Sequence, residues 1–161
     1  RVAGRDAAAF LQAQSMNDVN ALAPARWQWN GLLTPKGRLI TLFALLREGD
    51  DQFLLVLPDV TAADLAAHLK KFVFRSKLSL LPLDDWHACA GPATSGPDRA
   101  LAAGDAGTGW VLDLSGDGAS RGLWLLPPDT GRVRLFTLLL LAFVARLVRL
   151  LAHEAGQHLP L

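Results

Sequence analysis

The sequence predicts an α+β fold in which helices flank an antiparallel sheet. Three observations lead to this class: short apolar segments alternate with turn-forming residues, one helical segment precedes them, and a second helical segment follows them. Consecutive strands joined by tight turns pair antiparallel, and helices at both ends of such a run pack on one face of the sheet.

The first predicted element is a helix over residues 7–12, because Asp6 is a suitable N-cap and apolar residues follow it. Residues 26–30 then alternate with a period of two. This pattern predicts a strand that carries both of its tryptophans on one face.

Two turns divide the strands that follow. Residues 34–37 read Thr-Pro-Lys-Gly, in which proline presets φ and glycine accepts a positive φ. A buried strand over 39–46 comes next, and the acidic turn at 48–51 separates it from a strand over 52–57. These segments predict a three-stranded antiparallel run.

The second helix begins with a capping-box pattern at residues 61–64, where aspartate takes the place of the usual glutamate. Leu65, Leu69 and Phe72 follow at spacings of four and three, which forms one apolar stripe. Residues 77–81 predict a closing strand.

The composition changes after residue 90. Nine of the 14 glycines lie between residues 91 and 131, so 91–109 is predicted to be a loop. Residues 110–114 and 123–126 predict a hairpin. We therefore divide the chain into an N-terminal unit, 1–90, and a second, partial α+β unit, 91–161, that ends in an apolar helix.

The C-terminal segment is the most apolar part of the chain. Residues 135–145 are apolar except for Thr137, and as a helix they rise about 16 Å, roughly half of a bilayer core. Arg146 and Arg149 follow, and each costs about 2.5–3.5 kcal/mol near a membrane centre. We expect a buried or partner-facing helix and no membrane span; a helix on a membrane surface is the alternative.

Composition excludes several classes of protein. A length of 161 residues suits one domain or two small ones. With 51% hydrophobic residues and a net charge of +1, the chain is neither disordered nor broadly basic, so we expect no direct nucleic-acid binding. The single cysteine, Cys89, excludes internal disulfides and metal sites built from several cysteines.

Three patterns only imitate chemical motifs. The glycines at 116, 118 and 122 have one residue too many for a phosphate fingerprint, and a strand rather than a helix follows them. His153 and His158 are five residues apart, so a helix separates them by about 140° and they do not form a metal pair. His87 and Cys89 share one face of a predicted strand, where a packed thiol is expected rather than a nucleophile.

Two polar segments have no evident packing role. One is residues 12–18, at the end of the first helix, and the other is the basic turn at 35–38. Carboxamides and a carboxylate can satisfy the edge of a heterocycle, while lysine and arginine can hold an anionic tail. Ordinary solvated turns are the alternative interpretation.

Three linked signatures occur in order over about residues 2–85, roughly half of the chain. They lie in residues 2–19, which contain Phe10-Leu11-Gln12-Ala13-Gln14; in residues 33–56, which begin Leu33-Thr34-Pro35-Lys36-Gly37-Arg38; and in residues 68–78, which end Phe74-Arg75-Ser76-Lys77-Leu78. Together they resemble the YgfZ-type folate-binding proteins, relatives of the aminomethyltransferase (T-protein) of the glycine cleavage system.

The resemblance implies an aminomethyltransferase-like folate-binding fold, built from several subdomains around a central channel. It implies tetrahydrofolate as the ligand and a role in supporting iron–sulfur enzymes, including enzymes that modify tRNA. Iron–sulfur proteins are then the expected partners, the expected location is cytoplasmic, and the C-terminal helix is a candidate for self-association.

Two positions separate the branches of this family. The transferase pattern has paired aspartates where this chain has Thr41 and Leu42, and a carboxylate is what that chemistry uses to manage the proton on the reacting amine. We therefore expect no classical catalytic residues. The YgfZ signature Lys-Gly-Cys-Tyr-x-Gly-Gln-Glu is also absent, and Cys89 lacks its surroundings, so we expect a truncated or degenerate chain.

The resemblance also assigns the candidate site. Gln14, Asn17 and Asp18 are expected to contact the pterin or its surroundings, and Lys36 and Arg38 to lie near a polyglutamate tail. Arg75 is a further candidate, with a structural ion pair as the alternative. The leading hypothesis is a tetrahydrofolate-binding accessory protein; the alternatives are an aminomethyltransferase of one-carbon metabolism and a non-enzymatic protein that docks a partner or a second copy. No metal site is expected.

Overall fold

The computed structural model describes residues 1–93, 102–105, 107–116 and 119–128. In chain order its elements are β1 (Val2–Ala3), α1 (Ala7–Gln14), β2 (Trp27–Leu33), β3 (Leu39–Gly49), β4 (Gln52–Val56), α2 (Ala62–Lys70), β5 (Ser79–Leu80), β6 (His87–Gly91), β7 (Ala103–Asp105), β8 (Gly109–Asp113) and β9 (Gly122–Leu126).

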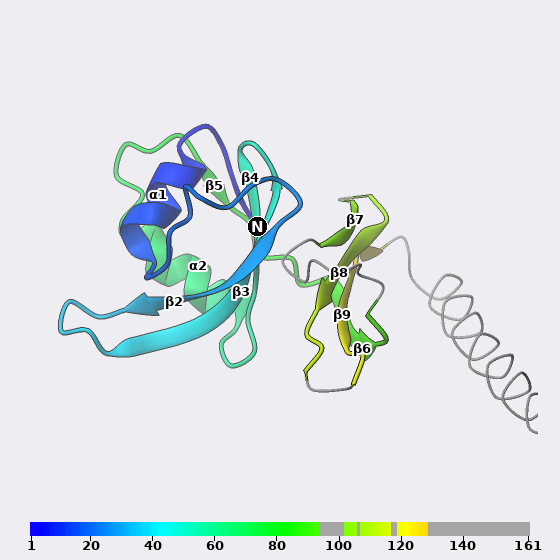
Figure 1. Cartoon of the computed structure of the whole chain (residues 1–161). Coiled ribbons are helices and arrows are strands. Elements are labelled where there is room, and N and C mark those ends of the chain that lie inside the picture. Colours follow the sequence, from blue (N-terminus) through cyan, green and yellow to red (C-terminus); the bar gives the residue numbers. More distant parts are fainter. Residues whose placement is uncertain (94–101, 106, 117–118, 129–161) are drawn as a thin grey trace, which may run out of the picture.

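These elements form two antiparallel sheets, a five-stranded one in the order β2-β3-β4-β1-β5 and a four-stranded one in the order β6-β9-β8-β7. Figure 1 shows α1 and α2 on one side of the five-stranded sheet and the four-stranded sheet on the other. The predicted α+β class, with helices flanking an antiparallel sheet, is confirmed.

The predicted three-stranded run is present as β2, β3 and β4. Trp29 pairs with Ala44, and Ala44 pairs in turn with Val56 on the next strand. The turn between β2 and β3 is closed by the Gly37 amide, which donates to the Thr34 carbonyl at 2.8 Å. Gly37 has a φ of +75°, the conformation for which glycine was expected there.

Alternation along β2 and β3 gives the five-stranded sheet two apolar faces. Leu32, Phe43 and Leu45 join the core beneath α1 and α2, whereas Trp27 and Ala44 belong to a second core against the four-stranded sheet. Because both faces are covered over part of their length, these strands read as nearly continuous apolar runs in the sequence.

The two helices begin in different ways. The first half of the predicted capping box of α2 is confirmed, because the Asp64 amide donates to Thr61 Oγ1 at 3.0 Å. In place of the second half, in which the carboxylate accepts from the N-cap amide, Asp64 Oδ2 accepts from the Thr61 hydroxyl at 2.7 Å. The predicted side-chain cap of α1 is wrong. Asp6 occupies the N-cap position, but its carboxylate accepts from the Lys77 amide at 2.6 Å and so ties the start of α1 to the segment before β5.

Beyond residue 80 the outcome is mixed. The predicted hairpin is confirmed as β8 and β9, but β7 lies within the stretch predicted to be a loop. The predicted strand at 77–81 is only Ser79–Leu80. The division expected at residue 90 falls inside β6, which pairs with β9. The predicted C-terminal helix and the patterns at His153 and His158 lie outside the described residues.

Candidate functional site

A buried asparagine fastens the polar segment after α1 to strand β2. Asn30 is 0% exposed, and its Oδ1 accepts from the amides of Asn17 and Gly31 at 3.0 and 2.8 Å. Its Nδ2 donates to Ser15 Oγ at 3.1 Å. Every polar atom of this buried amide is therefore used to hold residues 15–17 along the strand.

Gln12 fixes the continuation of the same segment. Its Oε1 accepts from the amides of Val19 and Asn20 at 2.6 and 3.1 Å. Neither Gln12 nor Asn30 was assigned a role from the sequence. A signal for Asn30 did exist, since alternation in β2 places it on the same inward face as the buried Leu32.

Two of the predicted ligand-binding residues lie on this fastened segment, and a third lies just before it. Gln14 is half-buried in the last turn of α1. Asn17 is exposed, and its Nδ2 donates to the Trp29 carbonyl at 2.6 Å. Asp18 is also exposed, and its Oδ1 accepts from the amides of Asn20 and Ala21 at 3.0 and 3.3 Å. Two of the three side chains therefore already contact the chain's own backbone.

The two predicted cations lie at the tip of the β2–β3 hairpin, where both are exposed. Thr34 closes this tip: its amide donates to the Arg38 carbonyl at 2.8 Å, and its Oγ1 accepts from the Arg38 amide at 3.1 Å. No acidic residue occurs from position 19 to position 47, so the charges of Lys36 and Arg38 are not offset within the hairpin.

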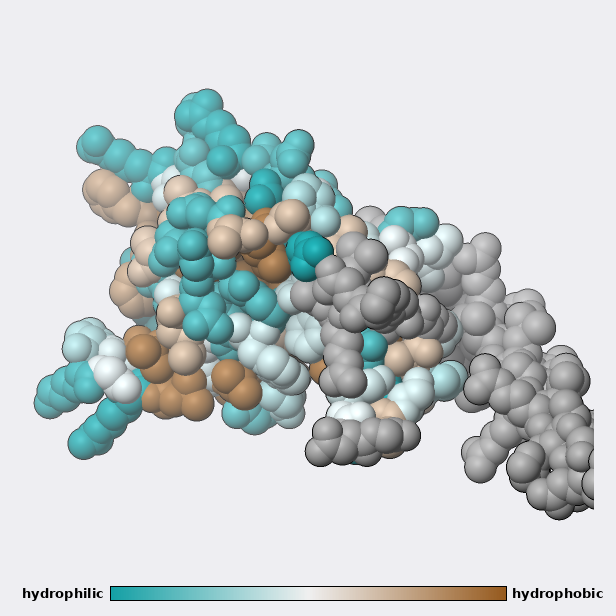
Figure 2. Space-filling view, in the orientation of Figure 1, coloured by the Kyte–Doolittle hydropathy of each residue, from teal (hydrophilic) through white to brown (hydrophobic). Residues whose placement is uncertain are grey.

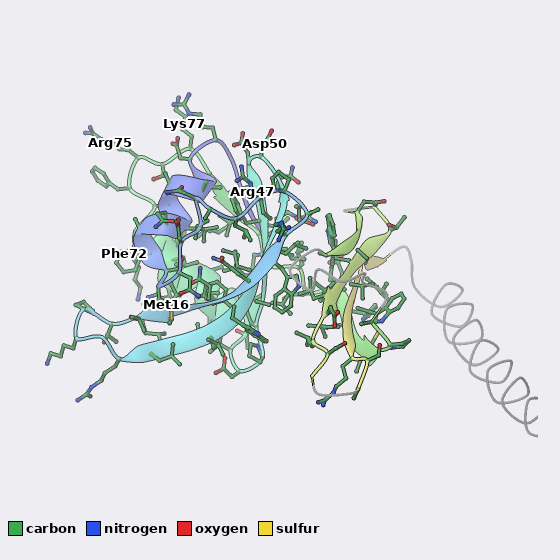
Figure 3. All side chains as sticks on the ribbon, viewed as in Figure 1. Met16, Arg47, Asp50, Phe72, Arg75 and Lys77 are labelled. Carbon is green, nitrogen blue, oxygen red and sulfur yellow. The ribbon has the colours of Figure 1, made fainter. Side chains whose placement is uncertain are left out.

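Arg75 is separate from the other predicted residues. It is exposed on the connection between α2 and β5, and its guanidinium lies 5.3 Å from the centre of the Phe74 ring. Figure 3 shows Arg75 near Lys77, well away from Met16, which marks the fastened segment. The structure therefore does not bring Arg75 to the polar segment after α1.

Thr41 and Leu42, the positions at which the transferase pattern has paired aspartates, hold no carboxylate themselves. The carboxylate of Asp59 lies beside Thr41. Thr41 is buried, and its Oγ1 donates to Asp59 Oδ1 at 2.9 Å. Leu42, on the opposite face of β3, is 38% exposed. Asp59 comes from the loop after β4, and this pairing could not be inferred from the spacing of the two residues in the sequence.

Other chemical groups are dispersed. Among the described residues no three His, Cys, Asp or Glu side chains form a group that could hold a metal ion. Within the same part of the chain no helix is long and apolar enough to cross a membrane.

Cys89 lies on β6 opposite Trp124, and burial raises the pKa of its thiol. A raised thiol pKa is the reverse of what nucleophilic chemistry needs.

A pocket of about 190 Å³ opens where the end of β4 approaches β6. Its walls include Leu57, Trp86 and His87, and none of the six predicted ligand-binding residues lines it. The Arg1 guanidinium lies 5.2 Å from the centre of the Trp86 ring. This pocket is therefore distinct from the predicted site.

No protein-family model matches the chain. It is 33% identical over 100 residues to the mitochondrial iron–sulfur cluster assembly factor IBA57 homolog of Mycosarcoma maydis, a match that covers 54% of this chain and 25% of that protein. It is 32% identical over 121 residues to the corresponding protein of Neurospora crassa, covering 65% and 28%. An aminomethyltransferase of Bacillus subtilis is 36% identical over 56 residues, covering 35% and 16%.

The fold is also found in a solved structure, the glycine cleavage system aminomethyltransferase T from Bartonella henselae. The TM-score is 0.72 at 20% identity, and the match covers 86% of this chain and 42% of that one. The chain spans about a quarter of the length of the two fungal relatives. It is thus similar in sequence to the IBA57-type assembly factors and to an aminomethyltransferase, and this confirms the resemblance carried by its three signatures.

Proposed function

We propose that this chain is a tetrahydrofolate-binding accessory protein that supports the assembly or repair of iron–sulfur enzymes, among them enzymes that modify tRNA. The observation that carries the proposal is its similarity to two proteins named as iron–sulfur cluster assembly factors, over 54% and 65% of its length. The similarity to an aminomethyltransferase supports a folate as the ligand.

The β2–β3 hairpin supports this choice of ligand chemistry. A folate has a heterocycle rich in donors and acceptors at one end and glutamate carboxylates at the other. Asn17 and Asp18 are hydrogen-bonded to residues of β2, Gln14 ends the helix just before them, and the exposed Lys36 and Arg38 lie at the tip of the β2–β3 hairpin. Polar groups and cations on one hairpin suit the two ends of such a molecule. Arg75 lies elsewhere on the molecule.

Calorimetric titration with tetrahydrofolate, as the monoglutamate and as a polyglutamate, tests the binding claim. We expect both forms to bind and the polyglutamate to bind more tightly, because its additional carboxylates reach the hairpin cations. The double substitution Lys36→Ala and Arg38→Ala should remove this preference, whereas the matched substitutions Lys70→Ala and Lys71→Ala on α2 should leave it. No heat and no thermal shift at millimolar ligand would overturn the binding claim.

The accessory role is tested in cells that lack the gene. We expect the activities of their iron–sulfur enzymes to fall and to recover when this chain is supplied. A chain carrying Lys36→Ala and Arg38→Ala should restore less activity than the Lys70→Ala, Lys71→Ala control. Unchanged iron–sulfur enzyme activities in the deletion strain would contradict the role without touching the binding claim.

The enzymatic alternative is an aminomethyltransferase, and one observation keeps it open to test. Asp59 places a carboxylate at hydrogen-bond distance from Thr41, where the transferase pattern has an aspartate. The Thr41 side chain is nevertheless 1% exposed and lies under α1 and α2 in the sheet, away from solvent. We expect no glycine-cleavage half-reaction. Detectable transfer that is lost in Asp59→Asn would establish the alternative instead.

The location in the cell is a separate proposal. The two fungal relatives are named as mitochondrial proteins. We propose a cytoplasmic location for this chain, as expected from the sequence. Fractionation of the producing cells, with detection of the chain by antibody, tests it directly.

A further inference from the structure

Six large apolar side chains are exposed together on the β2–β3 hairpin. Figure 2 shows a brown, hydrophobic surface at the lower left, where the hairpin lies, beside protruding hydrophilic side chains. The members of this set, which we call the hairpin face, are Met16, Trp29, Leu33, Leu39, Ile40 and Leu42, and their exposed fractions range from 38% to 57%.

The register between β2 and β3 shifts at Leu32/Leu33, so the side chains of residues 39–42 do not alternate regularly, and contacts around Gly31 show how part of this set is gathered. Trp27 and Trp29 are two residues apart in β2, and their rings pack edge to face with 5.8 Å between the ring centroids. Gly31 pairs with Leu42 on β3. A Cβ on Gly31 would lie 2.9 Å from Met16 Sδ and 3.0 Å from Leu39 Cδ1, so glycine is what allows these two side chains to cover the strand.

The hairpin face continues a core that is already covered at its other end. Trp27, on the same face, is 8% exposed because the four-stranded sheet packs over it, whereas Trp29 is 46% exposed. On this face of β2, the covered part of the strand therefore ends between Trp27 and Trp29. An exposed apolar patch on the order of several hundred Å² is the size that marks an interaction site.

The outer edge of β2, beside the hairpin face, is not free to pair with a strand of another protein. The outer edge of β2 is occupied by the chain itself, since Ser15 bridges to Leu32 and the Met16 amide donates to the Gly31 carbonyl at 3.0 Å. Asn17 Nδ2 donates a hydrogen bond to the Trp29 carbonyl. Addition of a partner strand at these positions is blocked, so a partner docks by packing its side chains across the face.

Charge decides what kind of partner fits. Lys36 and Arg38 border the face, and the sequence from position 19 to position 47 contains no carboxylate. A second copy of the chain carries the same two cations on its own face. The chain's apolar run at 135–145 is flanked by arginines on both sides. Like charges disfavour both of these occupants, and complementarity favours an acidic one.

We propose that the hairpin face docks a separate protein that presents an apolar stripe bordered by carboxylates, such as an acidic amphipathic helix lying across β2 and β3. The face supplies the buried apolar contact, and Lys36 and Arg38 select the sign of the partner's charge. The proposal gives Lys36 and Arg38 a role beside the one proposed for them with folate. Its test is therefore run without folate and does not depend on folate binding.

Three amphipathic helical peptides test the proposal. They share one stripe of leucines and carry glutamate, glutamine or lysine beside it, and their binding is followed by fluorescence anisotropy without folate. We expect the glutamate peptide to bind most tightly, the glutamine peptide less tightly and the lysine peptide least tightly. The double substitution Leu39→Ser and Ile40→Ser should weaken the glutamate peptide about tenfold or more, because it removes two large apolar contacts. The matched control Phe74→Ser and Leu81→Ser, also at exposed apolar positions, should not.

Charge reversal gives the second measurement. Lys36→Glu with Arg38→Glu should invert the order of the three peptides, whereas Lys70→Glu with Lys71→Glu, at the end of α2, should leave it unchanged. Circular dichroism and thermal unfolding confirm that every variant is folded. Equal binding of the three peptides, or binding that is indifferent to Leu39→Ser and Ile40→Ser, would overturn the proposal.

The other occupants give results of their own, and each of them also overturns the proposal. A dimer in sedimentation equilibrium that is lost in the Leu39→Ser, Ile40→Ser variant would assign the face to a second copy. A monomer that dimerises only when residues 133–161 are removed would assign it to the chain's own C-terminal segment. Binding to vesicles of neutral and anionic phospholipid, but not to the glutamate peptide, would assign it to a lipid surface.

Discussion

The indole Nε1 of Trp110 donates a hydrogen bond to Oε1 of Glu48 at 3.0 Å, and this contact links the two sheets. The Glu48 side chain is 1% exposed. It also accepts from Arg1, through Nε to Oε2 at 2.7 Å and through Nη2 to Oε1 at 3.0 Å. One buried carboxylate at the end of β3 is therefore satisfied by partners from both sides of the sheet interface.

We predict that Glu48→Ala lowers the free energy of unfolding by about 3 kcal/mol, because it leaves the Trp110 N–H and the Arg1 guanidinium without their acceptor. Trp110→Phe, which removes one donor and keeps the ring, should cost about 1 kcal/mol. Urea unfolding measures both values. A loss for Glu48→Ala no larger than that for Trp110→Phe would show that Glu48 does not join the sheets energetically.

Asn30 gives a prediction about local order. Asn30→Leu puts an apolar side chain of similar size in the buried position and removes the acceptor of the Asn17 and Gly31 amides. It also removes the donor to Ser15 Oγ, which keeps its hydrogen bond to the Leu11 carbonyl. We expect a loss of about 2–3 kcal/mol and faster hydrogen exchange at the amides of Met16 and Asn17. Gln28→Ala removes only a single 3.2 Å contact to a backbone carbonyl and serves as the control. Unchanged exchange at Met16 would mean that Asn30 does not hold the segment.

Arg47 fastens two connections to the end of β3. Its Nη1 donates to the Leu22 carbonyl at 2.8 Å, and its Nη2 and Nε donate to the carbonyls of Asp50 and Gly49, each at 3.1 Å. Figure 3 shows Arg47 beside Asp50, and the ion pair between them measures 3.8 Å.

We expect Arg47→Lys to cost about 1–2 kcal/mol, because one ammonium cannot replace a planar fork that reaches three carbonyls. Thermal unfolding compares it with Arg5→Lys, a substitution at an exposed arginine, which should be neutral within about 0.5 kcal/mol. Equal melting temperatures for the two variants would contradict the prediction.

Features that depend on neighbouring residues could be predicted from the sequence. The hydrogen bond from the Asp64 amide to Thr61, the turn at Gly37 and the alternation in β2 each involve residues within a few positions of one another, where propensity and spacing decide the outcome. The three signatures likewise identified the fold, because each is read from a continuous stretch of chain.

Features that depend on distant residues could not be predicted. Asp6 was expected to cap α1, but its carboxylate is taken by the amide of Lys77, 71 residues away. The pairing of Thr41 with Asp59 and that of Glu48 with Trp110 likewise follow from how β3 meets other elements. For the candidate site, the sequence indicated the polar segment and the cations but not the Asn30 network that holds residues 15–17 to β2.

Cys89 allows a prediction about reactivity. Burial raises the pKa of its thiol above the ordinary value, so at pH 8 the folded protein holds less thiolate than a free cysteine does. Since the thiolate is the reactive form, modification by Ellman's reagent should be slower than that of cysteine in the same buffer. The rate should still be rising above pH 9 and should reach the free-cysteine rate in urea. The chain has no other cysteine, so the signal is unambiguous. Native modification faster than that of free cysteine at pH 7 would instead indicate a lowered pKa, and His87, two residues away on the same strand, would then become a candidate base.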